Sequence, residues 1–226
     1  MNLALRFTEE VRRKVDPLWR KEHNHPFVQG IGDGTLAVDK FQYYLKQDFV
    51  FLIGFSRAIA IAIAKANNLD DMSWFSRLLN ETLNTEMDLH FSYCQEFGLS
   101  EEEIAQTVPS PTTEAYINHL LQVANNGTTI ETAVAILPCS WGYSEIGKKL
   151  EAQGLPTEAP LYSRWIEMYS SPDFEELAKD LRNFIDREHD KLHEDGRMKL
   201  VNIFFKSSEY EYRFWDAAFR MECWQD

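Results

Sequence analysis

Apolar residues recur along this chain with the 3.6-residue period of an amphipathic helix. The first stretch, 3–22, carries them at Leu3, Phe7, Val11, Val15, Leu18 and Trp19. The same pattern predicts further helices at 39–66, 70–96, 111–127, 129–153, 161–169, 173–193 and 198–222, with a short one before Gly32. These elements are long enough for one helical layer to bury its apolar stripe against another.

Glycine and proline residues separate the predicted helices. Gly98 and Gly154 follow two of them, and Pro111 opens another. The alternation of isoleucines within 59–63 also fits a strand, but the alanines between them and the flanking helical pattern favour a helix. No segment combines a strand pattern with a hairpin turn. We therefore expect an all-α fold, a compact bundle of about eight to ten helices, with residues 1–226 in a single domain.

Charge narrows the class of partner. The chain has 36 Asp and Glu residues against 23 Lys and Arg residues, a formal net charge of −13. Such a surface repels phosphate backbones and anionic lipids, so neither nucleic acid nor a membrane is an expected partner. The longest apolar run, 58–64, is far shorter than a bilayer requires.

Three cysteines, Cys94, Cys139 and Cys223, occur without the close spacing of a disulfide framework or a zinc site. An odd and sparse set is typical of a reduced intracellular protein, so we expect a cytoplasmic location.

Two carboxylates fall on apolar helix faces. Asp48 has Tyr44 and Leu52 one turn away, and a charge there is costly unless it is paired or hydrogen-bonded. Glu211 has Phe214 and Trp215 on its face, and burial would raise its pKa toward a value suited to donating a proton. Alternatively, the aspartate is a buried structural group tied to an arginine or to backbone, and the glutamate is partly exposed.

Cys139 follows Pro138 inside a helical pattern. Because proline cannot continue a helix without losing a hydrogen bond, we expect a kink or a restart there. A restart would place the thiol near a helix N-terminus, where the dipole lowers its pKa. Tyr143, four residues on, would share its face. The alternative is that Cys139, as expected for Cys94 and Cys223, is a small core residue.

Histidines offer a different interpretation. Glu86 and His90 are four residues apart, as are His189 and His193, and helix pairs with this spacing hold di-iron centres in some bundles. Charged neighbours surround both pairs, however, so ordinary solvated helix faces account for them equally well, and the sequence demands no metal or cofactor.

Five blocks in order along the chain resemble the TenA-type thiaminase II family. They are His25-Pro26-Phe27-Val28, Asp33-Gly34-Thr35-Leu36, the segment 41–48, the segment 137–145 and Tyr210-Glu211 with Phe214-Trp215. The Leu137-Pro138-Cys139 block resembles the cysteine-bearing branch of that family.

The resemblance implies a haem-oxygenase-like bundle without haem, assembled as a homotetramer. It also implies hydrolysis of 4-amino-5-aminomethyl-2-methylpyrimidine to the hydroxymethylpyrimidine and ammonia, and cleavage of thiamine at the same methylene. Carried over by position, Cys139 is the nucleophile and Glu211 the acid/base. Asp48 grips the aminopyrimidine, and the pocket wall is formed by Phe51, Tyr116, Tyr143 and Tyr169.

Phe51 is a departure from the family pattern, which commonly has tyrosine three residues after the aspartate. The ring is expected to face the pocket of Asp48 without a hydroxyl to position the thiol. Two other functions therefore stay open: a metal-dependent oxidase of the same shape using Glu86, His90, His189 and His193, and a non-catalytic pyrimidine-binding protein.

Overall fold

The computed structural model describes residues 6–225, and within them the only regular elements are helices. The N-terminal half contains α1 (Phe7–Lys14), α2 (Asp16–His23), α3 (Pro26–Gly32), α4 (Val38–Lys65), α5 (Leu69–Asn80), the π-helix η1 (Glu81–Glu86), α6 (Met87–Glu96) and α7 (Glu101–Ala105). The C-terminal half contains α8 (Pro111–Asn126), α9 (Thr129–Gln153), α10 (Pro160–Ser170), α11 (Pro172–His189) and α12 (Glu194–Arg220). The predicted all-α bundle is confirmed.

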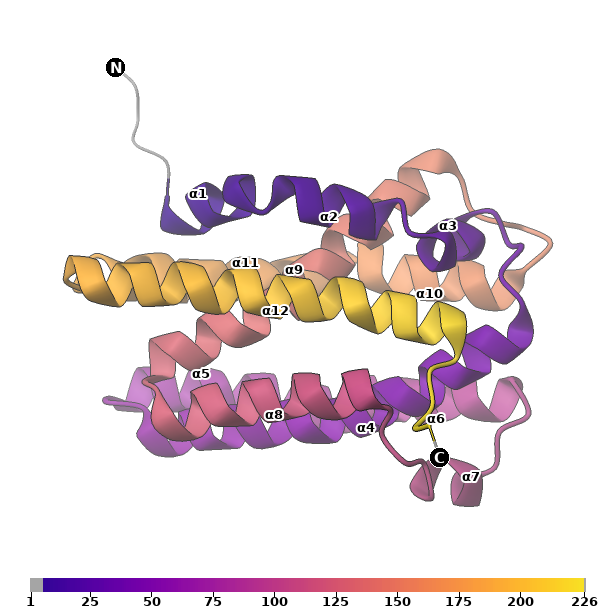
Figure 1. The fold of residues 1–226 in the computed structure, drawn as a ribbon, viewed down its shortest axis with the longest axis horizontal. Coiled ribbons are helices and arrows are strands. Elements are labelled where there is room, and N and C mark those ends of the chain that lie inside the picture. Colours follow the sequence, from indigo (N-terminus) through magenta and orange to yellow (C-terminus); the bar gives the residue numbers. More distant parts are fainter. Residues whose placement is uncertain (1–5, 226) are drawn as a thin grey trace.

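Two long helices organise the core. α4 packs beside α8, and α9 packs against α10, α11 and α12 while also contacting α4 (Figure 1). α4 is long and apolar enough to cross a membrane by length and composition, but 56% of its most apolar window is buried inside the fold. Its apolar character is therefore that of a central core helix.

Serine and threonine side chains fix where several helices begin. Ser110, Thr128 and Ser171 each accept a hydrogen bond from a backbone N–H in the first turn of α8, α9 and α11. These bonds satisfy donors that the first turn leaves free. The helix starts predicted near these residues are thus set by capping.

The predicted helix 70–96 contains a feature that its pattern did not indicate. Its middle six residues form η1, a π-helix with wider i→i+5 turns. Residues four apart are separated by slightly more than one turn of an α-helix, which has 3.6 residues per turn, and by slightly less than one turn of a π-helix. The two deviations offset each other, so that Leu78, Thr82 and Glu86 all line the same cavity.

The restart predicted at Pro138 is wrong. α9 runs unbroken from Thr129 to Gln153 with Pro138 in its interior, because burial on every side holds this segment in the core. Cys139 consequently lies in the middle of α9, far from the N-terminus of that helix. The dipole argument for an acidic thiol therefore does not apply.

Gly147 permits the close approach of α10 to α9. A Cβ atom there would lie 2.5 Å from the carbonyl carbon of Tyr169 and 2.6 Å from the nitrogen of Ser170. These are backbone atoms, which cannot move aside as a flexible side chain can. The glycine thereby sets the position of Tyr169 relative to Cys139.

We predict that Gly147→Ala lowers the free energy of unfolding by about 1–3 kcal/mol, because overpacking against backbone forces the two helices apart. Gly196→Ala, in α12, is the matched control, because the nearest atom to its Cβ would be the Cβ of Leu192 at 3.5 Å. That variant should be neutral or more stable by up to about 1 kcal/mol. Urea denaturation of both variants measures the difference, and equal stabilities would show that the α9–α10 contact is not tight.

Candidate active site

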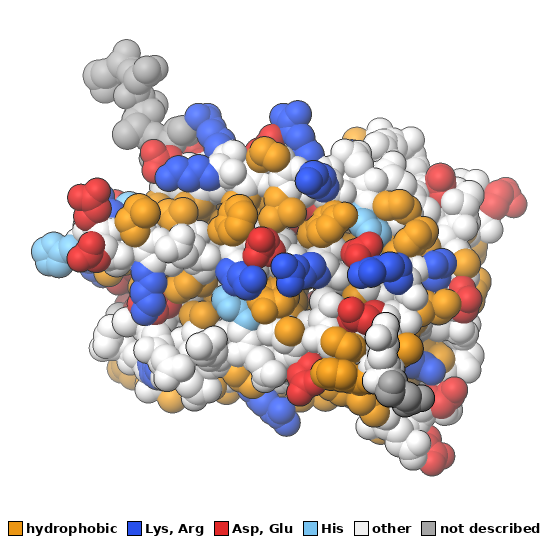
Figure 2. Space-filling model, viewed as in Figure 1, with side chains coloured by type: hydrophobic (Ala, Val, Ile, Leu, Met, Phe, Trp, Pro, Cys, Tyr) orange, Lys and Arg blue, Asp and Glu red, His pale blue; other side chains and the backbone are white. Residues whose placement is uncertain are grey.

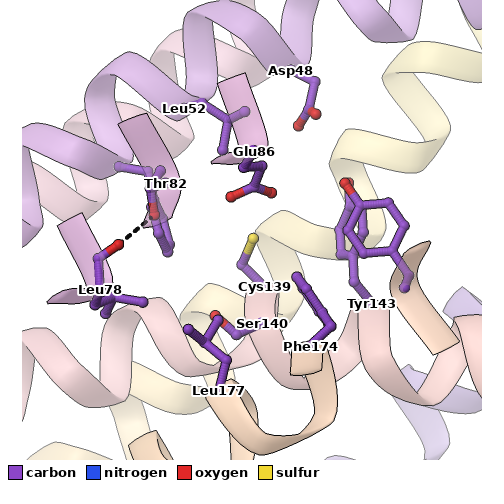
Figure 3. Close-up of a pocket in the computed structure, with 12 residues that line it drawn as sticks. Asp48, Leu52, Leu78, Thr82, Glu86, Cys139, Ser140, Tyr143, Phe174 and Leu177 are labelled. Atoms are coloured by element: carbon purple, nitrogen blue, oxygen red, sulfur yellow. Dashed lines mark hydrogen bonds between the residues drawn. The ribbon is translucent and has the colours of Figure 1, made fainter. Parts of the chain in front are cut away.

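A small inner cavity lies between α4, η1, α9, α10 and α11, and adjoins a larger outer one. Its lining is Asp48, Leu52, Phe55, Leu78, Thr82, Glu86, Cys139, Ser140, Tyr143, Tyr169, Phe174 and Leu177. Figure 3 shows the thiol of Cys139 and the carboxyl group of Glu86 directed toward one another, with Asp48 beyond them. The inner cavity has a volume of about 20 Å³ and the outer one about 530 Å³.

Asp48 is buried and, among residues 6–225, forms no ion pair with an arginine; its neighbour is His90. The Nδ1 atom of His90 lies 3.6 Å from the carboxylate, and Nε2 lies 2.6 Å from the carbonyl oxygen of Leu45. Burial lowers the pKa of His90 to about 4, and burial together with Glu86 and Glu211 raises the pKa of Asp48 well above its usual range. Neutral His90 donates from Nε2 to Leu45, so its Nδ1 lone pair faces Asp48. His90 therefore lies beside Asp48 as a neutral ring.

Cys139 is half-buried and reduced, and it is set among acids. Burial raises the pKa of its thiol well above the ordinary value, and the nearby carboxyl groups of Glu211, Glu86, Asp48 and Glu22 raise the pKa further. The lowered thiol pKa predicted from the sequence is therefore wrong, since desolvation and negative neighbours both oppose a thiolate. In the free protein this cysteine is a neutral thiol near pH 7.

Glu211 is buried on α12 and accepts a hydrogen bond from the hydroxyl of Tyr116, with an Oη–Oε1 distance of 2.5 Å. Burial raises the pKa of Glu211 to about 7, and the bond from Tyr116 acts in the opposite direction. A carboxyl group with this pKa can both give and take a proton near neutrality.

The four predicted aromatic residues do not share one position. Tyr143 and Tyr169 line the cavity, with ring centroids 4.8 Å apart. Phe51 and Tyr116 are absent from its described lining and pack on each other at 4.7 Å. Phe51 also contacts Phe214 at 5.7 Å, and its role as a substrate-binding residue stays a prediction. A helix face wide enough for Asp48 and Leu52 leaves Phe51 on the adjoining core side.

Two further carboxyl groups belong to the surroundings of the thiol. Glu86 was predicted only as a metal ligand on a solvated face; η1 instead turns it into the cavity. Glu22 is buried, accepts a hydrogen bond from Trp215 Nε1 at 3.3 Å, and leaves Oε2 without a partner among the described residues. Burial and the proximity of Glu211 raise the pKa of Glu22 well above its usual range. The sequence gives no signal for Glu22, because a charged residue at the end of an amphipathic helix is ordinarily exposed to solvent.

The ligand set of the alternative metal site does not assemble. Within residues 6–225, no group of three or more His, Cys, Asp or Glu side chains is arranged to hold a metal ion. His189 stacks on Phe7 with ring centroids 4.1 Å apart, and His90 is committed to Leu45 and Asp48. These contacts account for the positions of His90 and His189 without a metal ion.

Comparisons with known proteins agree with this arrangement. The profile of the TENA/THI-4/PQQC family matches residues 12–221. An aminopyrimidine aminohydrolase of Halalkalibacterium halodurans is 43% identical over 96% of this chain and 97% of its own length. A TenA homologue from P. horikoshii OT3 superposes with a TM-score of 0.88 at 31% identity, covering 96% and 99% of the two chains. A haem-oxygenase-like domain from Shewanella denitrificans, 16% identical, has a TM-score of 0.76 over 98% and 94% and shares the fold.

We predict that Glu22→Gln changes how stability depends on pH. A carboxyl group whose pKa is raised on folding stabilises the protein fully below its unfolded pKa of about 4.3, and that stabilisation is lost as pH rises through the folded pKa. The wild type should therefore lose stability relative to Glu22→Gln as pH rises above about 4.3. The difference in unfolding free energy, variant minus wild type, should increase by up to about 1.4 kcal/mol per pH unit. Urea denaturation across this range tests it, and parallel curves would contradict the raised pKa.

Proposed function

Because the chain belongs to the TENA/THI-4/PQQC family, we propose that it is an aminopyrimidine aminohydrolase of thiamine salvage. Its substrates are 4-amino-5-aminomethyl-2-methylpyrimidine, which yields the hydroxymethylpyrimidine and ammonia, and thiamine, cleaved at the same methylene. The observation that carries the proposal is the meeting of Cys139, Asp48 and Tyr143 at one cavity, with Glu211 buried nearby. The whole chain acts as a single-domain enzyme without a cofactor.

Each role follows from chemistry and environment. Asp48 binds the amino and ring-nitrogen edge of the pyrimidine, and Tyr143 and Tyr169 contact its faces. Cys139 attacks the ring as the nucleophile, and Glu211 moves the protons. Tyr116 holds Glu211, and Phe51 supports Tyr116 from the core side. The missing hydroxyl at Phe51 is thus a change in the packing behind the acid.

The reaction proceeds by addition and elimination. Glu211 takes the proton of the Cys139 thiol as the sulfur bonds to a ring carbon, and it passes that proton to a ring nitrogen, which ends the aromaticity of the pyrimidine. The ring electrons then expel the amine from the methylene, with the electron pair of the broken C–N bond leaving on nitrogen. Water adds to the exposed methylene carbon, its proton passes to Glu211, and the C–S bond breaks to restore the ring and the thiol.

The size of the cavities implies movement on binding. The inner cavity holds about one water molecule, so a pyrimidine ring fits only if the walls shared with the outer cavity open. Phe174 and Leu177, both from α11, are in that shared wall. Their displacement would merge the two spaces beside Cys139.

A homotetramer in the cytoplasm completes the proposal. Apolar side chains recur every seven residues along α12, at Met198, Phe205, Tyr212 and Phe219. Met198 and Phe205 are 58% and 47% exposed, and Figure 2 shows apolar side chains gathered over this face. A seven-residue apolar repeat on an exposed helix face is typical of helices that pair with another helix.

We predict that Cys139→Ala abolishes hydrolysis of the aminomethylpyrimidine while retaining binding, because the covalent step is lost and the pocket keeps its other walls. Cys94→Ala, which changes a buried cysteine outside the cavity lining, is the control and should stay active. Ammonia release and calorimetric binding measure the two properties. Full activity without Cys139 would contradict the mechanism, and binding without turnover by the wild type would indicate a non-catalytic pyrimidine-binding protein.

We further predict that Tyr116→Phe moves the limb of the pH–rate profile that reports Glu211 to higher pH, by about 1–2 units. The hydrogen bond from Tyr116 favours the carboxylate, and a bond to a charged group is worth about 1.5–3 kcal/mol. Tyr210→Phe is the matched control, because Tyr210 stacks on Tyr116 with centroids 5.2 Å apart. If both variants keep the wild-type profile, Tyr116 does not tune the acid.

A further inference from the structure

Glu86 stands where the two cavities join. The outer cavity is lined by Glu81, Thr82, Thr85, Glu86, Met168, Tyr169, Ser171, Asp173, Phe174 and Leu177. Five of these residues also line the inner cavity, Glu86 among them. The outer cavity is therefore the space into which the inner one opens, and Glu86 lies at the boundary, with its carboxyl group directed toward Cys139 in Figure 3.

The carboxyl group of Glu86 is not engaged elsewhere. Within residues 6–225 it forms no hydrogen bond or ion pair with another side chain or with the backbone outside its helix, whereas Glu81 accepts a bond from Thr85 Oγ1 at 2.8 Å. Burial raises the pKa of Glu86 to about 7. A carboxyl group that faces a cavity and has no protein partner is available to bind a ligand.

The charge of that ligand follows from the cavity walls. No Lys, Arg or His side chain is in the described lining of either cavity, and Glu81, Glu86 and Asp173 are all acidic. The ligand that this lining favours is therefore positively charged. Under the proposed function, the substrates carry such a charge on the methylene substituent, as an ammonium or as a thiazolium.

We infer that Glu86 binds the cationic group that the reaction expels, and that η1 exists to aim this side chain at it. The inference rests on the proposed function. Asp48 then holds the ring and Glu86 holds the departing group, and both carboxyl groups line the cavity that contains the Cys139 thiol. The 530 Å³ outer cavity has room for a substituent as large as a thiazolium ring, so one site accepts both substrates.

The change in charge of the leaving group during the reaction distinguishes this role from a catalytic one. When the C–N bond breaks, its electron pair neutralises the leaving group, so the attraction to Glu86 weakens as the reaction proceeds. Glu86 therefore stabilises the bound substrate more than the transition state, which lowers KM without raising kcat. Loss of the attraction also favours release of the neutral amine or thiazole. Glu86 is a positioning and specificity residue.

The test is Glu86→Gln, which keeps the shape of the side chain and removes its charge. For the aminomethylpyrimidine, we expect KM to rise about tenfold and kcat to change less than about threefold, as loss of one charge-assisted contact predicts. The inhibition constant of the hydroxymethylpyrimidine, whose methylene substituent is neutral, should change less than about twofold. That constant also shows that the variant is folded with its pocket intact.

Glu167→Gln is the control. It removes the same charge as Glu86→Gln, but Glu167 is exposed on α10 and lies outside both cavity linings. Its KM should equal that of the wild type. If the wild type hydrolyses the aminomethylpyrimidine, two results overturn the inference. One is an unchanged KM in Glu86→Gln, and the other is an equal loss of affinity for the neutral inhibitor. A wild-type protein that fails to hydrolyse the aminomethylpyrimidine overturns the proposed function itself.

Discussion

Four carboxyl groups, those of Glu22, Asp48, Glu86 and Glu211, raise the pKa of the Cys139 thiol, and no basic side chain lines the cavity beside it. Burying these groups as anions would be prohibitively costly, so each has a raised pKa and holds a proton more firmly than it would in water. The free site therefore carries less negative charge near pH 7 than four ordinary carboxylates would. A cationic substrate changes this balance, because its charge favours ionisation of the acids and of the thiol together.

The fold makes this arrangement possible by distributing the acids over separate helices. α2, α4, η1 and α12 each carry one of them, and α9 carries the thiol. The surrounding aromatic core, in which Trp215 stacks on Tyr44 at 5.5 Å and contacts Tyr143 at 5.0 Å, supplies the apolar burial that offsets the cost of desolvating polar groups. A site of this kind requires a large and rigid core, which helices of 25 residues or more provide here.

The sequence predicted the helices and most of the pocket, since both depend on local periodicity and on recognisable blocks. Asp48, Cys139, Tyr143 and Tyr169 do meet at one cavity. The prediction was wrong where tertiary packing overrides a local rule, because Pro138 sits inside an unbroken helix. The position of Glu22 could not be predicted, because its partner Trp215 is distant in the sequence. The π-helical position of Glu86 could not be predicted either, because an i→i+5 turn does not alter the hydrophobic periodicity of the sequence.

The account stands on a thiol that is neutral until the substrate arrives. Titrating the ultraviolet absorbance of the thiolate in the free protein, as the difference between the wild type and Cys139→Ala, measures this directly. The carboxyl neighbours and the burial of Cys139 predict a midpoint well above the ordinary thiol pKa of about 8.5. A midpoint at or below that value would show that the site ionises its own nucleophile, and would contradict the central role of substrate charge.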